Sequence, residues 1–257
     1  MDTNNSLERY RELMLAAPAL FTSSADDGIT ILTTDSGIAD AEAAAKLMLQ
    51  KKGLPSCFGQ VGLVYEDQYV WFLRDAVRFK NDSLGTYIRI VHKNLEFAGV
   101  AIIPRLDRKF VLIRHFRHAT RKWHWEVPRG FADSRNPIDT VNAELKEEIG
   151  ALAINVCQLG TYFPDSGLLA SSVHVYLADV AIGEASDEVE PISKIQSFDF
   201  QELNTMIRGG HIDDGFTLVA IAFLRSKLDA SGNDRTMDCT EADGRLLSDG
   251  KSDSSAR

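Results

Sequence analysis

Hydrophobic and polar positions repeat with different periods along the chain, and these periods predict its secondary structure. Apolar side chains recur at helical spacing in residues 7–21 and 39–53, with a short strand pattern at 28–34 between them. From residue 60 onward, β-branched and aromatic residues alternate with polar ones at a period of two, which is typical of strands. We therefore expect a small α/β extension over residues 1–55, followed by a larger domain.

The larger domain is expected over residues 56–228, with a mixed sheet and flanking helices. Two apolar runs at 96–104 and 109–119 indicate a central hairpin whose strands are buried on both faces. Further strands are expected at 154–163 and 171–182, and two helices follow near the end of the domain. The predicted fold class is therefore α/β, or more narrowly α+β.

The last residues, 229–257, differ in composition from the rest. They consist mainly of Ser, Asp, Gly and Arg, with few apolar side chains. Such a segment cannot bury enough apolar surface to offset the entropy lost on ordering, so its composition predicts disorder.

Charge and cysteine content limit the classes of function. The 257-residue chain has a net charge of -9, which argues against nonspecific binding to nucleic acid or to anionic membranes, since both require a basic face. A phosphorylated substrate would need a local cluster of cations. Cys57, Cys157 and Cys239 have no paired spacing and suggest neither a disulfide framework nor a zinc cluster. A reducing cytoplasm is the expected location.

Three acidic residues stand close together in a predicted helix. Glu144, Glu147 and Glu148 occupy positions i, i+3 and i+4, which fall on one helix face. Oxygen ligands of this kind suit Mg2+ or Mn2+, which would also offset the repulsion among the carboxylates. An acidic helix face is also common as solvated surface, and the three glutamates alone do not separate the two interpretations.

Cations gather just upstream of this helix, in the segment IRHFRHATRKWHWE. The cluster contains Arg114, Arg117, Arg121 and Lys122. Because a planar guanidinium matches phosphate oxygens in bidentate fashion, the cluster is a candidate phosphate site. The alternative is that these side chains pair with neighbouring carboxylates.

Histidines in the same segment raise the question of a zinc site. His115 and His118 are separated by an odd number of residues, so on a strand their side chains point to opposite faces. We expect core packing, or a hydrogen bond to substrate, for these two and for His124.

The stretch from Gly130 to Gly150 resembles a Nudix box, the signature of the Nudix hydrolase superfamily. That signature reads G, five residues, E, seven residues, then R-E-apolar-x-E-E-x-G. With one residue missing in the loop, six residues match its positions: Gly130, Glu144, Leu145, Glu147, Glu148 and Gly150. The resemblance implies a mixed β-sheet sandwiched between helices. It extends over roughly residues 60–228 and is greatest to the ADP-ribose pyrophosphatase-like members.

Two positions depart from the signature. Ala143 stands where arginine is expected, and the loop glutamate has no counterpart near Arg135 and Asn136. An arginine beside a metal-binding carboxylate would orient it through a charge-assisted hydrogen bond. Because the two missing groups have opposite charge, their joint absence is consistent with the loss of one mutually stabilising pair.

The resemblance also implies a metal site. Glu144, Glu147 and Glu148 would hold Mg2+ or Mn2+, with the main-chain carbonyl of Arg129 as a further ligand. Glu144 and Glu148 would be the carboxylates closest to the chemistry.

Substrate contacts follow from the same resemblance. Arg117 would contact a phosphate, with Arg114 and Arg121 as neighbouring cations, and Glu126 would support the site.

These features predict an enzyme. The expected reaction is Mg2+- or Mn2+-dependent hydrolysis of the pyrophosphate bond in a nucleoside diphosphate linked to another moiety, with ADP-ribose or a nucleotide sugar as the leading substrate. The resemblance further implies that Glu188 or Glu190 would activate the attacking water. The alternative, motivated by the two departures, is a Nudix-fold module that binds a nucleotide without cleaving it. N-terminal strands resembling those that such enzymes exchange between protomers imply a homodimer.

Overall fold

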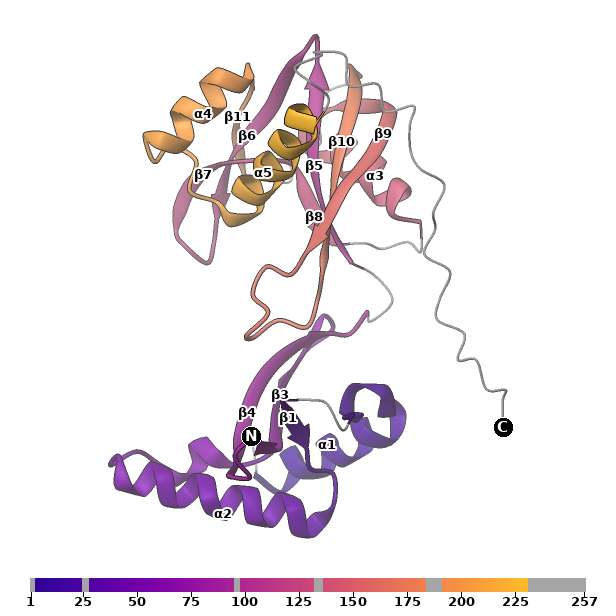
Figure 1. Cartoon of the computed structure of the whole chain (residues 1–257). Coiled ribbons are helices and arrows are strands. Elements are labelled where there is room, and N and C mark those ends of the chain that lie inside the picture. The colour runs from indigo at the N-terminus through magenta and orange to yellow at the C-terminus, as the bar shows by residue number, and fades with distance from the viewer. Residues whose placement is uncertain (1–2, 25–27, 95–97, 132–135, 184–190, 231–257) are drawn as a thin grey trace, which may run out of the picture. The chain divides into compact units, whose positions relative to one another are not determined.

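The chain folds into two compact units (Figure 1). The computed structural model describes residues 3–24, 28–94, 98–131, 136–183 and 191–230. The first unit comprises Met1–Phe97 and Phe163–Ser172, and the second comprises Ala98–Tyr162 and Val173–Arg257. No helix in these described ranges is both long and apolar enough to cross a bilayer.

The second unit is built on a seven-stranded mixed sheet. Its strands are β5 (Gly99–Leu106), β6 (Lys109–Arg117), β7 (Lys122–Glu126), β8 (Arg129–Phe131), β9 (Ala151–Tyr162), β10 (Val173–Ile182) and β11 (Ile192–Phe198). The order is β11-β6-β5-β10-β9, with β7 paired to β6 and β8 paired to β5. Only the β5–β10 pair is parallel among the described strands of this sheet. Its helices are α3 (Pro137–Ile149), α4 (Phe200–Arg208) and α5 (Gly215–Ala230).

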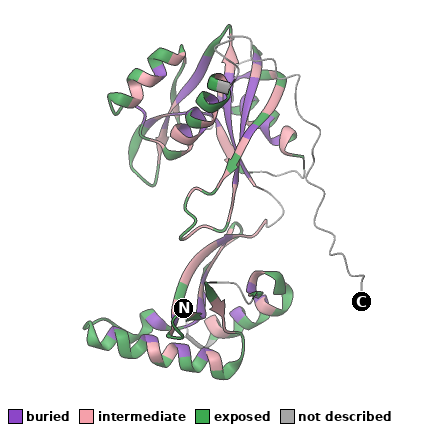
Figure 2. Ribbon diagram, in the orientation of Figure 1, coloured by how far each residue is buried: buried purple, intermediate pink, exposed green. Residues whose placement is uncertain are grey.

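Strand β5 lies at the centre of two hydrophobic cores. Val100 and Ile102 pack in a cluster with α3, whereas Ala101 and Ile103 pack in a cluster with α4 and α5. Successive side chains of a strand point to opposite faces, so this alternation places helices on both sides of the sheet. Figure 2 shows the buried residues concentrated in β5 and its neighbours. The predicted fold class, with strands of the central hairpin buried on both faces, is confirmed.

The hairpin between β5 and β6 closes through two residues with left-handed backbone. Asp107 and Arg108 have φ values of 48° and 66°. Positive φ at both central positions is the mark of a type I′ turn, whose twist matches that of the flanking strands.

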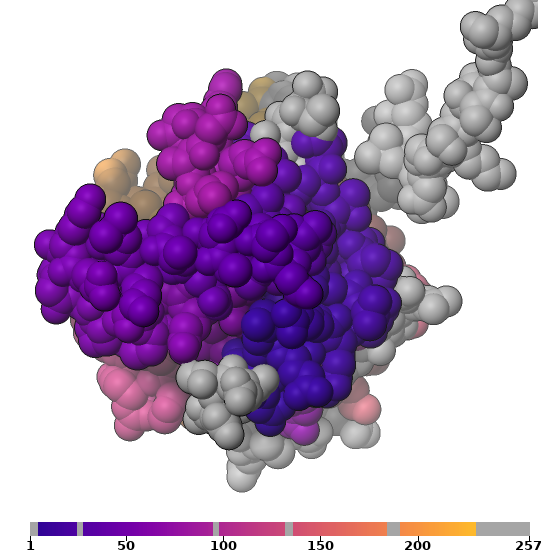
Figure 3. Space-filling view, turned by 90° about the horizontal axis from the view of Figure 1, so that it is seen from below, coloured from indigo at the N-terminus to yellow at the C-terminus, as the bar shows by residue number. Residues whose placement is uncertain are grey.

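The first unit contains a four-stranded antiparallel sheet and two helices. Its elements are α1 (Thr3–Ala16), the short 3-10 helices η1 (Pro18–Phe21) and η2 (Ser56–Gly59), α2 (Asp35–Lys51), and the strands β1 (Ile29–Ile31), β2 (Gly62–Glu66), β3 (Val70–Phe79) and β4 (Leu84–His92). The strand order is β1-β3-β2, with β4 paired to β3. Figure 3 shows this unit's atoms, indigo to purple, forming one continuous surface.

The division of the chain by contacts differs from the division expected over residues 1–55 and 56–228. Strand β3 pairs with β1 from the N-terminal segment. One core cluster joins Tyr10 and Ile38 of the helices to Leu73 and Val91 of β3 and β4. The strands that begin at residue 62 therefore complete the hydrophobic core of the first helices. The segment 231–257, for which disorder was predicted, lies outside the described residues.

A buried polar network fixes α1 and η1 on this sheet. The Tyr10 hydroxyl donates to Asp75 Oδ1 at 2.6 Å, and Arg89 Nε donates to Asp75 Oδ2 at 2.6 Å. Phe21 packs edge-on against Tyr10 and lies under the Arg89 guanidinium. Burial, with the Asp75 charge beside it, raises the pKa of Tyr10, so its hydroxyl stays a donor. Asp75 is only 3% exposed, and its two partners satisfy a charge that would otherwise be costly to bury.

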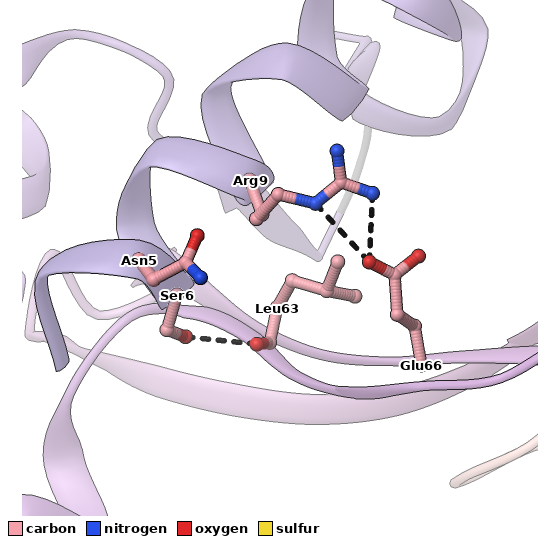
Figure 4. Close-up of a pocket in the computed structure, with 5 residues that line it drawn as sticks. All are labelled: Asn5, Ser6, Arg9, Leu63 and Glu66. Atoms are coloured by element: carbon pink, nitrogen blue, oxygen red, sulfur yellow. Dashed lines mark hydrogen bonds and ion pairs between the residues drawn. The ribbon is translucent and has the colours of Figure 1, made fainter. Parts of the chain in front are cut away.

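A small pocket separates α1 from β2 (Figure 4). Arg9 donates to Glu66 Oε1 through Nε and Nη2 at 3.1 and 2.7 Å, and the Ser6 hydroxyl donates to the Leu63 carbonyl at 2.8 Å. Gly62 permits this close approach, because a Cβ at that position would lie 2.3 Å from Ser6 Oγ.

Candidate active site

The site is organised by helix α3, whose two ends are marked in the sequence. The Asn136 side chain accepts a hydrogen bond from Ile138 N, and Pro137 occupies the first helical position. Gly150 ends the helix in the left-handed conformation, with φ of 63°, and its N–H bonds back to the last turn. These caps set where α3 begins and ends.

The three glutamates of α3 have different environments. Glu148 is 2% exposed, Glu144 is half-buried, and Glu147 is exposed. Because Val141, Leu145 and Glu148 lie on one helix face at spacings of three and four, the apolar contacts of the first two carry Glu148 into the interior. The acidic helix face is therefore more than solvated surface, since one of its carboxylates is buried.

Gly130 in β8 lies directly against Glu144. A Cβ at position 130 would be 1.7 Å from Glu144 Oε1 and 2.3 Å from its carboxyl carbon. No side chain other than hydrogen fits there unless the glutamate moves. This close approach gives a physical reason for the glycine at the first position of the box signature.

The neighbouring residue, Arg129, holds the buried glutamate through its main chain. Its N–H donates to Glu148 Oε2 at 3.2 Å. On the other side, His115 Nδ1 lies 3.9 Å from Glu148 Oε1, and the histidine residue is 3% exposed. Gly130 and Arg129 therefore bring two helix glutamates to one short stretch of strand.

A second buried carboxylate lies close by on β7. Glu126 is fully buried, and its Oε2 accepts from Arg117 Nε at 2.8 Å and from Arg129 Nε at 3.3 Å. Arg117 Nη2 also lies 2.7 Å from this oxygen, as an ion pair without hydrogen-bond geometry. Glu126 Oε1 has no hydrogen-bond partner among the described residues. Two guanidinium groups thus share one carboxylate oxygen and leave the other as an available acceptor.

The side chain of Arg129 reaches the start of α5. Its guanidinium stacks over the Phe216 ring at 4.1 Å, and Nη2 lies 3.6 Å from Asp214 Oδ1. Asp214 caps α5 by accepting from Thr217 N at 2.9 Å. Burial and then the Asp214 charge raise the pKa of Tyr162, whose ring packs edge-on against Phe216.

The other predicted cations lie elsewhere. Arg114 belongs to the opposite face of β6 from His115 and Arg117, because strand neighbours alternate. Arg121 lies in the β6–β7 turn, where its guanidinium contacts His118 at 2.9 Å and stacks over Phe116. Of the predicted arginine cluster, Arg117 alone is joined to the buried carboxylates by a described contact.

Several residues of the prediction lie outside the described ranges or have another role. Glu188 and Glu190, the candidates for activating water, lie in the segment 184–190, which is outside the described residues. His124 bridges elements, with Nδ1 2.7 Å from Asp213 Oδ1 and Nε2 2.6 Å from Thr120 Oγ1.

The residues present fit a hard divalent cation. No three His, Cys, Asp or Glu side chains converge as a ready-made cluster within the described part of the chain. Mg2+, however, is commonly bound through one or two carboxylates, with waters and substrate phosphates completing its shell. Glu144 and Glu148 supply such a pair, since both approach the Arg129–Gly130 stretch of β8.

Comparisons with known proteins agree with this arrangement. The NUDIX domain family model matches residues 96–218. Residues 96–218 are a NUDIX domain. The Nudix resemblance seen in the sequence is thereby confirmed, and the matched range contains β5 to β11, α3 and α4.

Two individual proteins illustrate the similarity. One is a "CMP-5'-(N-acetyl-N-hydroxy-3-aminopropyl)phosphonate hydrolase" of Streptomyces rubellomurinus (strain ATCC 31215), which is 37% identical over 95 residues. The match spans 36% of this chain and 46% of that relative, which is less than half of its length. The other is a crystal structure of an ADP compounds hydrolase, with a TM-score of 0.59 and 20% identity, covering 68% of this chain and 94% of that one. At this identity, the second match supports the fold alone.

Sequence reasoning did not find the role of the Arg129 side chain or of Phe216. Arg129 was considered only for its main-chain carbonyl, and Phe216 is 87 residues further along the chain (216 minus 129). The available signal was an arginine placed between a buried-strand pattern and the box glycine, where a charged side chain needs a partner.

Proposed function

We propose that this NUDIX-domain protein hydrolyses the pyrophosphate bond of a nucleoside diphosphate linked to another group, with Mg2+ or Mn2+ as cofactor. The observation that carries the proposal is the fit of the Glu144 carboxylate against Gly130 beside the buried Glu148. Two carboxylates of α3, held against strand β8, provide oxygen ligands of the kind that a phosphate-bound divalent cation requires.

The residues have distinct roles in this proposal. Glu144 and Glu148 hold the cation, with Glu147 and the Arg129 carbonyl as further ligands. The bound cation would neutralise charge on the transferring phosphoryl group and acidify a water. Arg117 is held by Glu126 and keeps donors beyond those on that carboxylate, because a guanidinium has five N–H groups. Those donors would offset the negative oxygens of the substrate.

The substrate class follows from the predicted phosphate contacts and is supported by the names of the relatives. One relative is named for a CMP-linked phosphonate and the other for ADP compounds. We propose ADP-ribose or a nucleotide sugar as the leading substrate, with Glu188 or Glu190 activating the water. An ADP-ribose pyrophosphatase-like enzyme would release AMP and ribose 5-phosphate.

A second candidate function is nucleotide binding without cleavage. Ala143 is exposed and carries no group that could orient Glu144, and the described residues include no complete metal-ligand cluster. A protein with these properties could retain a nucleotide-phosphate site while turning over slowly.

A substrate panel separates the two candidates. Purified protein would be incubated with ADP-ribose, nucleotide sugars and a CMP-linked phosphonate, with Mg2+, with Mn2+ or with EDTA. Metal-dependent release of a nucleoside monophosphate supports the enzyme. Tight nucleotide binding without turnover of any member supports the sensor.

We also propose that the protein is a homodimer in a reducing, cytoplasmic setting, with residues 1–55 as an extension of the NUDIX domain. Cys57 and Cys157 are free thiols, as such a compartment allows. Light scattering on a sizing column tests the dimer, since a monomeric mass at micromolar concentration contradicts it.

A further inference from the structure

Arg129 occupies a junction between the two helices that flank the site. Its main-chain N–H reaches Glu148 of α3, while its side chain reaches Asp214 and Phe216 at the start of α5. One residue thus joins a candidate metal ligand to a helix on the other side of the sheet.

A second link ties the same stretch of chain to α5. Val127 N donates to the Thr217 hydroxyl at 3.0 Å, and that hydroxyl donates to Asp214 Oδ2 at 2.8 Å. Thr217 is fully buried. Residues 127 and 129 are therefore both anchored on the Asp214 carboxylate, one through a hydroxyl and one through a guanidinium.

The anchoring side chain is well constrained. The Arg129 guanidinium is bounded by Glu126 Oε2, by Asp214 Oδ1 and by the face of Phe216, and the side chain is 22% exposed. A stacked, partly desolvated guanidinium of this kind contributes more to the stability of the local structure than an exposed ion pair does. The N–H of the same residue donates to Glu148.

We propose that Arg129 is a positioning residue that supplies the orientation of the helix carboxylates which Ala143 does not. The side chain holds the segment 127–130 against α5. That segment in turn presents the Arg129 N–H to Glu148 and Gly130 to Glu144. This inference rests on the proposed metal-dependent function. The helix carboxylates are thus oriented by the segment 127–130 rather than by another side chain of α3.

Mn2+ binding, measured by titration calorimetry on the full chain without substrate, tests the proposal directly. Arg129→Ala is expected to weaken Mn2+ binding about 10- to 100-fold, because residues that support metal ligands have effects of this size. Arg129→Lys keeps the charge but loses the planar stack and fork, so it should restore part of the affinity. In turnover assays, Arg129→Ala should lower kcat with little change in KM.

The matched control is Arg105→Ala. Arg105 pairs with Asp179 across β5 and β10, at 16% side-chain exposure, so its removal also breaks a partly buried arginine–aspartate pair in the same unit. This variant should lose stability but retain wild-type Mn2+ affinity. Phe216→Leu is a second test if Arg129→Ala does not fold, since it removes only the aromatic face and should weaken Mn2+ binding in the same direction.

The outcomes separate the two proposals. Wild-type Mn2+ affinity in Arg129→Ala, or in Phe216→Leu where the first variant is unfolded, overturns the positioning role. Equal weakening in Arg105→Ala also overturns it, because the effect would then be general. Mn2+ binding by the wild type without any turnover contradicts the proposed hydrolase, while the positioning role is still decided by the affinities. Absence of Mn2+ binding in the wild type overturns both.

Discussion

The carboxylate of Glu144 occupies the space into which a side chain at Gly130 would extend, with only 1.7 Å between Oε1 and the position of a Cβ. The contact joins α3 to a three-residue strand that pairs with the central strand β5. The close approach of the Gly130 main chain therefore limits where the Glu144 carboxylate can lie.

Gly130→Ala should separate activity from folding. The added methyl group meets the flexible end of Glu144, so the glutamate can move aside, and we expect a loss of stability of about 1 kcal/mol or less. The displaced carboxylate should lower kcat by about 100-fold, the size of effect that a 1 Å misplacement can have. Gly28→Ala is the control, because a Cβ there meets nothing within 4 Å. Unchanged kcat in Gly130→Ala would mean that Glu144 has no part in the reaction.

Glu148→Gln and Glu147→Gln should have unequal effects. The glutamine at 148 can still accept from Arg129 N–H but cannot supply an anionic ligand, so we expect at least about a 100-fold loss of turnover with a melting temperature close to wild type. Glu147 is exposed and should matter less. Steady-state kinetics and thermal melts on both variants decide the order, and retained activity in Glu148→Gln would show that α3 is not the metal site.

Asp75→Asn should destabilise the first unit strongly. It removes the charge that pairs with Arg89 and leaves that guanidinium, at 22% exposure, with a weaker partner. Breaking a buried pair in this way costs about 3 kcal/mol. Asp35→Asn removes the exposed pair with Arg11 and should cost less than about 1 kcal/mol. Hydrogen exchange of the β3 and β4 amides measures both, and equal effects would refute a special role for the buried network.

Lowering the pH should weaken the ion pair between Arg9 and Glu66, which attaches α1 to β2. Hydrogen bonding from Arg9 holds the pKa of Glu66 below its ordinary value of 4.5. The ion pair therefore contributes fully above pH 4.5, and its contribution is lost as the pH falls through the lower pKa of the folded state. Glu66→Gln should melt below the wild type at pH 7, and the difference should shrink on acidification. A difference that stays constant down to pH 2 contradicts this account.

The fold was largely predictable because its signals are local. The apolar run of β5, the glycine that ends α3 and the aspartate before α5 each determine a nearby backbone feature. The core around Tyr10 and Leu73 was not predictable, since it depends on which strands pair with β1. Pairing between distant strands leaves little trace in a single sequence.

The site was predictable to the extent that it follows the box signature. Helical spacing placed the glutamates on one face, but only packing decides that Glu148 is buried and Glu147 exposed. The arginine cluster was overestimated for a similar reason, because Arg121 lies in a turn and Arg114 on the other strand face. The contacts of Arg129 with Asp214 and Phe216 join residues far apart in sequence, and no spacing rule predicts them.

The first unit is discontinuous in sequence, since residues Phe163–Ser172 belong to it while the strands on either side belong to the second unit. That inserted loop is bound to β4, with Ile90 N donating to the Leu168 carbonyl at 2.8 Å and Ala170 N donating to the Ile90 carbonyl at 3.1 Å. A single protease cut near Phe97 would therefore leave the N-terminal fragment bound, through β4, to a loop that remains covalently part of the NUDIX domain. The two pieces should co-elute under native conditions and separate only in denaturant.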